Sequence, residues 1–117
     1  DYWGEHYRNI TKQVPKLKDV ILSCESYTEL EIPKNSIIYC DPPYAATTEY
    51  RDTFDQAQFW DWCRQQSKAG HQVFISEYNA PDDFKCIWEK GAKTTFSWHA
   101  ENLSTKVALE RLFVFGK

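Results

Sequence analysis

One stretch decides the expected fold: Ser36-Ile37-Ile38-Tyr39-Cys40-Asp41-Pro42-Pro43-Tyr44. The run from Ser36 to Cys40 predicts a buried strand, because it is short, apolar and rich in β-branched residues. The strand must end at Asp41, because the two adjacent prolines that follow cannot donate hydrogen bonds to a sheet. Asp41 is therefore expected at the edge of the sheet where α/β proteins bind their ligands.

Upstream of this stretch, the pattern predicts a helix, a strand and a turn. Residues 7–14 are typical of the end of a helix, and Pro15 should stop it at Val14 because proline disfavours helical geometry in the preceding residue. Val20-Ile21-Leu22 predicts a short buried strand that runs into a polar loop. Residues 33–36 predict a turn that leads into the strand ending at Cys40.

Downstream, residues 54–69 predict an amphipathic helix. Asp55 is the expected N-cap, and Gly70 is the expected stop. The three-to-four spacing of Phe59, Trp60 and Cys63 marks the face that should be buried.

The C-terminal third predicts three strands and a short helix. Gln72–Ser76 is expected to be a strand, with an exit loop at 79–82, and residues 84–90 predict a helix that ends at Gly91. Residues 93–98 and 111–115 predict two further strands. Because no long helix separates these last two, they are expected to form an antiparallel hairpin at one edge of the sheet.

This order of elements predicts an α/β domain with parallel strands. Ligands bind beyond the carboxyl ends of such strands. Two segments are expected there, Asp41–Tyr44 and Ser76–Pro81, so they should share one rim of the sheet.

The composition sets limits on domain number and on partners. The chain has 117 residues, a net charge of −3 and a pI of about 5.6, which indicates one domain or less and argues mildly against nucleic acid. A local basic cluster offsets this argument; it consists of Lys12, Lys16 and Lys18. No apolar run approaches the roughly 20 residues that span a bilayer, so no membrane partner is expected. The four cysteines are scattered, which favours reduced thiols over a metal site.

Asp41-Pro42-Pro43-Tyr44 carries the chemistry that the sequence predicts. The amino group of an aromatic ring is a poor nucleophile, because its lone pair is delocalised. Acceptors aimed at its two N–H groups favour the tetrahedral geometry needed for attack, and the Asp41 carboxylate and the Pro42 carbonyl can serve. Tyr44 can stack on a base swung out of a duplex. The alternative is that Asp-Pro-Pro is only a turn and Tyr44 only a packing residue.

The segment Ile38–Tyr44 resembles the fourth conserved motif of the D12, Dam-like class of DNA adenine-N6 methyltransferases, and it resembles phage and prophage members in particular. The resemblance covers nearly all of the chain: Val20–Tyr27, Phe74–Asn79 and Lys106–Phe115 also match segments of the family. It implies the C-terminal half of a Rossmann-like class I methyltransferase sheet. It also implies S-adenosylmethionine as cofactor, double-stranded DNA with a flipped adenine as substrate, and a location in the cytoplasm of a bacterial or phage-infected cell.

The resemblance also implies roles for individual residues. The catalytic residues would be Asp41, Pro42 and Tyr44. The substrate-binding residues would be Pro43, Glu77, Tyr78 and Asn79. The cofactor-binding residues would be Tyr27, Ser26 and Asp41; Ser26 stands where the family more often has Asp. Neither a metal nor a covalent intermediate is needed for this reaction.

One departure from the family limits what the chain is expected to do alone. The family's Gly-rich first motif binds the methionine end of the donor, whereas the glycines here are isolated: Gly4, Gly70, Gly91 and Gly116. Residues 1–13 are therefore interpreted as the tail of the target-recognition region and residues 14–117 as the C-terminal part of the catalytic domain. The missing N-terminal half is an expected partner, and the chain alone is expected to be inactive.

Two alternatives stay open. One is methylation of another planar amino group, such as cytosine N4 or an RNA adenine. The other is a fragment or partner-dependent subunit that folds or binds DNA without turnover.

Overall fold

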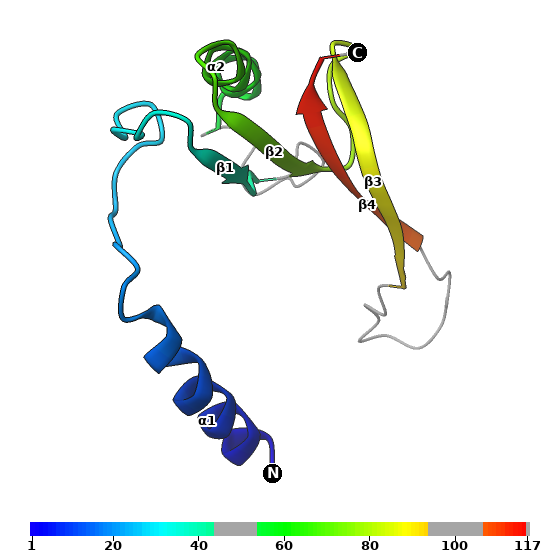
Figure 1. Ribbon diagram of the computed structural model, residues 1–117. Coiled ribbons are helices and arrows are strands. Elements are labelled where there is room, and N and C mark those ends of the chain that lie inside the picture. The colour runs from blue at the N-terminus through cyan, green and yellow to red at the C-terminus, as the bar shows by residue number, and fades with distance from the viewer. Residues whose placement is uncertain (44–53, 94–106, 117) are drawn as a thin grey trace. The chain divides into compact units, whose positions relative to one another are not determined.

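The structure is a computed structural model that describes residues 1–43, 54–93 and 107–116 (Figure 1). The chain divides into two compact units, residues 1–30 and residues 31–117. The second unit contains a mixed α/β fold, so the expected fold class is confirmed at this level.

The first unit begins with two consecutive helices, α1 (Tyr2–Gln13) and the 3₁₀ helix η1 (Val14–Leu17). The Asp1 side chain accepts a hydrogen bond from the backbone N–H of Trp3 and caps α1. The α-helix ends at Gln13, next to the expected position. Val14 nevertheless keeps helical dihedral angles, because Pro15 is accommodated in the first turn of η1.

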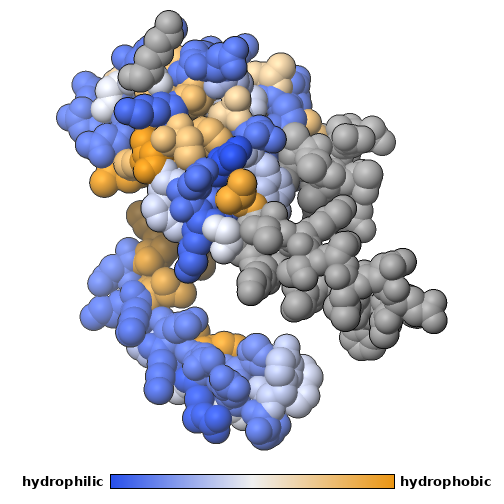
Figure 2. Space-filling model, turned by 90° about the vertical axis from the view of Figure 1, so that its right-hand side faces the viewer, coloured by the Kyte–Doolittle hydropathy of each residue, from blue (hydrophilic) through white to orange (hydrophobic). Residues whose placement is uncertain are grey.

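The expectation of a buried strand at Val20-Ile21-Leu22 is wrong. The segment has no regular secondary structure, and Ile21 and Leu22 are 94% and 84% exposed. Figure 2 colours such hydrophobic residues orange. The reason is physical: a strand needs a neighbour for its backbone hydrogen bonds, and no strand in the described ranges pairs with these residues.

The second unit is built on a four-stranded sheet in the order β1-β2-β4-β3. Its strands are β1 (Ile37–Cys40), β2 (Gln72–Glu77), β3 (Phe84–Lys93) and β4 (Val107–Phe115). β1 and β2 run parallel, as expected, whereas β4 is antiparallel to both β2 and β3. Figure 1 shows β2 between β1 and the long β3–β4 pair.

The expectation of a short helix at residues 84–90 is also wrong, because this segment forms β3. Phe84 pairs with Phe115 and Lys93 with Val107, and a bulge interrupts the ladder between Cys86 and Trp88. Long-range pairing with β4 thus overrides the local pattern. An antiparallel pair does form one edge of the sheet, but residues 84–93 supply its outer strand; residues 94–98 of the expected strand lie outside the described ranges.

β1 is a strand as expected, but it is buried on one face only. Its side chains alternate between exposed and half-buried, with Ile37 at 73% and Tyr39 at 64% exposure. This alternation arises because β1 is the outermost strand of the described sheet.

The helix α2 (Gln56–Lys68) packs on the sheet against β2 and β4. Both of its expected ends are confirmed. The Asp55 carboxylate accepts a hydrogen bond from the N–H of Gln58 at 2.9 Å, and Gly70 has a φ of 99°, which suits glycine. The expected apolar face, formed by Phe59, Trp60 and Cys63, is buried. Neither α1 nor α2 combines the length and hydrophobicity that a membrane-spanning helix needs.

The core of the second unit joins this helical face to the middle of the sheet. Trp60 and Phe84 meet edge to face, with their ring centroids 4.8 Å apart. Beside them, Arg64 of α2 donates hydrogen bonds to Asp83, just before β3. This pairing holds the pKa of the Asp83 carboxyl below its usual value.

Ile75 provides a test of this core, because its side chain is fully buried in β2. Ile75→Ala should lower the free energy of unfolding by about 2–5 kcal/mol, since it leaves a cavity between α2 and the sheet. Urea denaturation followed by tryptophan fluorescence measures this loss. The matched control is Ile37→Ala in exposed β1, which should change stability by no more than about 0.5 kcal/mol. Equal losses for both variants would contradict the described core.

Candidate active site

The described parts of the two segments expected to share a rim of the sheet do so. β1 and β2 run parallel, and Cys40 at the end of β1 pairs with Ile75 near the end of β2. Asp41 follows β1, and Glu77 is the last residue of β2. Parallel strands end on the same side of a sheet. The pairing of β1 with β2 therefore places Asp41–Pro43 and Glu77–Asn79 at one edge.

Asp41, Pro42 and Pro43 differ in their exposure. The Asp41 side chain is exposed, Pro42 is buried, and Pro43 is half-buried. A buried proline with restricted dihedral angles makes the backbone at this point rigid. Tyr44 and the residues that follow it to 53 lie outside the described ranges, so the stacking role of Tyr44 stays a prediction.

Helix α2 anchors the chain on both sides of Asp41-Pro42. The buried Cys63 of α2 interacts with Cys40; this interaction lowers the pKa of Cys40 although burial opposes it, and the interaction and burial together raise the pKa of Cys63. On the other side, the Gln56 side chain donates a hydrogen bond to the Pro43 carbonyl at 3.1 Å.

The two expected acceptors have no such partner among the residues that the structure describes. The Pro43 carbonyl is occupied by Gln56. Within residues 1–43, 54–93 and 107–116, no hydrogen bond or ion pair engages the Asp41 carboxylate or the Pro42 carbonyl. A rigid backbone thus carries one carboxylate and one carbonyl at the sheet edge, and both are strong hydrogen-bond acceptors.

The segment that leaves β2 is held in a similar way. Glu77 is 3% exposed, and its carboxylate accepts a hydrogen bond from the N–H of Tyr78 at 2.8 Å. The guanidinium group of Arg111 in β4 donates to the Tyr78 carbonyl at 3.0 Å and to Asn79 Oδ1 at 3.3 Å. Tyr78 is half-buried and Asn79 is exposed.

The residues expected to contact the cofactor, Ser26 and Tyr27, belong to the first unit. The Ser26 hydroxyl lies 2.8 Å from that of Thr28, and it also accepts a hydrogen bond from the Thr28 N–H. Ser26 is therefore engaged in its own turn, and its side chain has no carboxylate. The ring of Tyr27 is half-buried.

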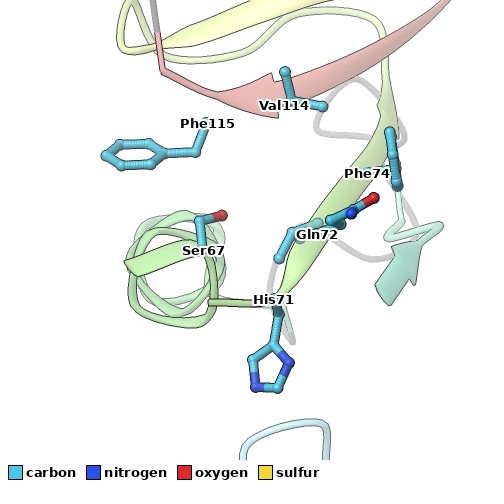
Figure 3. A pocket seen from close by; sticks show the side chains of 7 residues that line it. Ser67, His71, Gln72, Phe74, Val114 and Phe115 are labelled. Atoms are coloured by element: carbon cyan, nitrogen blue, oxygen red, sulfur yellow. The ribbon is translucent and has the colours of Figure 1, made fainter. Parts of the chain in front are cut away.

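A pocket of about 290 Å³ lies at the other end of β2 (Figure 3). It is lined by Ser67, His71, Gln72, Val73, Phe74, Val114 and Phe115. Gln72 begins β2, whereas Glu77 ends it, so the pocket is separate from the rim that carries Asp41. Nδ1 of His71 accepts a hydrogen bond from the Ser36 N–H at 3.1 Å, which gives this histidine a structural role at the start of β1.

Three residues that hold the site were not identified from the sequence: Gln56, Cys63 and Arg111. Gln56 follows an expected N-cap, and Cys63 lies on the expected buried face. The sequence thus predicted that both belong to the helix, but it did not predict their contacts with Pro43 and Cys40. Arg111 lies more than thirty residues beyond Tyr78 and Asn79. Its contacts depend on the register in which β2 pairs with β4, and the local sequence does not predict this register.

Comparison with known proteins identifies a family for the chain. The model of the D12 class N6 adenine-specific DNA methyltransferase family matches residues 5–107 of the chain. No curated protein and no solved structure matches significantly. The family match spans both units and includes the Asp41-Pro42-Pro43 rim. The chain therefore belongs to the D12 class N6 adenine-specific DNA methyltransferase family.

Proposed function

We propose that the chain forms the amino-acceptor part of an S-adenosylmethionine-dependent DNA adenine-N6 methyltransferase site, within a Rossmann-like sheet. Family membership supports the reaction. The observation that carries the assignment is the state of the Asp41-Pro42-Pro43 segment: Gln56 of α2 holds the Pro43 carbonyl, the Asp41 side chain is exposed, and no hydrogen bond among the described residues engages the Asp41 carboxylate or the Pro42 carbonyl.

Asp41 and Pro42 orient the adenine amino group. The carboxylate accepts a hydrogen bond from one N6–H, and the Pro42 carbonyl accepts from the other. Both contacts draw N6 away from the plane of the ring and turn its lone pair toward the methyl group. The donor would supply the methyl group: its C–S bond would break as the N–C bond forms, and the resulting thioether would leave. The carboxylate of Asp41 would stabilise the positive charge that develops on N6 until a proton is lost to solvent.

The remaining residues of the rim bind the base. Tyr44 stacks on an adenine that has been extruded from double-stranded DNA, since chemistry on a base requires its removal from the stack. Pro43 lines the same site. Glu77, Tyr78 and Asn79 form the opposite side, at the end of β2. The assignments of Pro43 and of the three residues at the end of β2 rest on the edge that the two parallel strands share.

The chain has only some of the residues that a site for the methyl donor needs. S-adenosylmethionine supplies an electrophilic methyl group. The exposed carboxylate of Asp41 and the half-buried ring of Tyr27 are suitable contacts for a cationic nucleoside. Ser26 offers no carboxylate, and its hydroxyl is bonded to Thr28. We therefore propose that a Gly-rich segment outside these 117 residues completes the donor site.

Asp41→Ala tests the acceptor assignment. The reading frame that encodes the chain is expressed in cells whose DNA lacks N6-methyladenine, and the modified base is measured by mass spectrometry of digested DNA. Loss of one preorganised polar partner should reduce methylation about 100- to 1,000-fold. The matched control is Asp19→Ala, at an exposed position in the first unit, which should leave methylation near the wild-type level.

Digests of DNA and of RNA from the same cells separate the alternatives. Near-full activity of Asp41→Ala would show that its assigned role is wrong. If wild-type protein instead produced N4-methylcytosine, or N6-methyladenine in RNA alone, another amino group would be the acceptor.

Calorimetry of the isolated chain with S-adenosylmethionine tests the second part of the proposal. Because the chain has no Gly-rich motif, we expect no binding in the micromolar range. A saturable micromolar isotherm would contradict the incomplete donor site, whereas the Asp41 assay would be unaffected. The absence of binding would also favour the alternative of a partner-dependent subunit.

A further inference from the structure

The backbone N–H and the backbone carbonyl of Tyr78 are each hydrogen-bonded to an ionisable side chain. Its N–H donates to the buried carboxylate of Glu77 at 2.8 Å, and its carbonyl accepts from Arg111 at 3.0 Å. Hydrogen bonds to charged groups are stronger than those between neutral groups. The backbone is therefore fixed at the point where the chain leaves β2 and enters the proposed base-binding edge.

Arg111 reaches this point because of the sheet register. It pairs with Glu77 of β2 on one side and with Glu89 of β3 on the other. Directly opposed residues of antiparallel strands point to the same face. Arg111 also forms an ion pair with Glu89, at 3.3 Å from Nε to Oε2, and this leaves Nη1 to contact the loop.

The same guanidinium group determines the orientation of the Asn79 amide. Arginine can only donate hydrogen bonds, so the amide atom that it contacts at 3.3 Å must be the oxygen. The NH₂ group of Asn79 then remains as the donor on an exposed side chain. Purine ring nitrogens accept hydrogen bonds, so this donor is suited to an adenine placed at the rim.

We propose that Arg111 is a positioning residue of the methyltransferase site: it fixes the Tyr78 peptide and turns the Asn79 amide so that its NH₂ group faces the target base. This inference rests on the proposed function, since the loop serves a base only if the base binds at this edge. Arg111 itself touches neither base nor donor, and it acts through Asn79 and Tyr78.

Nuclear magnetic resonance of this chain tests the positioning directly. In Arg111→Leu, the backbone amide resonances of Tyr78 and Asn79 should shift and exchange faster with solvent, while those of Ile75 and Phe113 keep their positions. Arg111→Lys retains the charge and a single donor nitrogen, so it should restore part of the wild-type spectrum. Glu89→Gln is the control, because it removes the ion pair but leaves both loop contacts. Unchanged Tyr78 and Asn79 resonances in Arg111→Leu and Arg111→Lys would overturn the proposal.

A double-mutant cycle tests the consequence for the reaction. With protein from the reading frame that encodes the chain, Arg111→Leu and Asn79→Ala should each lower kcat/KM for DNA about 10- to 100-fold, because misplacement of a binding group slows the reaction. The double variant should lose little more than either single variant. Glu89→Gln should stay within about twofold of wild type, as for other exposed ion pairs. Additive losses, or a Glu89→Gln loss equal to that of Arg111→Leu, would contradict the role.

The two experiments separate this inference from the proposed function. If wild-type protein methylates no DNA, the function is wrong, and the spectra still decide whether Arg111 holds the loop. If wild-type protein methylates DNA and depends on Asp41, but the Arg111 variants behave as wild type, only the inference is wrong.

Discussion

The parallel pairing of β1 with β2 is the constraint on which the site depends. β2 lies between β1 and β4, and its Ile75 is fully buried. Because β1 runs in the same direction, the chain must leave both strands at one edge. Asp41 and the Glu77–Asn79 segment therefore come together although more than thirty residues separate them. An antiparallel arrangement would place them at opposite edges, and the proposed acceptor site could not form.

The elements around this pair hold the site without occupying its polar groups. α2 contacts Cys40 through Cys63 and the Pro43 carbonyl through Gln56, and it leaves Asp41 exposed. β4 provides Arg111, which holds the Tyr78 backbone. Preorganised acceptors need not reorganise as the reaction proceeds, which is where enzymes gain much of their electrostatic stabilisation. The packing of α2 and β4 thus has a direct consequence for the chemistry proposed at the rim.

The parts of this arrangement that local chemistry determines were predictable from the sequence. Asp55 and Gly70 mark the ends of α2, and the two prolines mark the end of β1. The parts that depend on distant partners were not predictable in the same way. Residues 84–90 form a strand because β4 pairs with them, and Val20–Leu22 forms none because no described strand does. The contacts of Arg111 follow from the same long-range register.

The central claim is that parallel β1–β2 pairing brings Asp41–Pro43 and Glu77–Asn79 to one edge. Cross-strand nuclear Overhauser effects between backbone protons measure this pairing most directly. The account predicts contacts that follow the parallel register, from Ile37 with Gln72 to Cys40 with Ile75. Contacts in an antiparallel order, or none between the two strands in the folded chain, would contradict it.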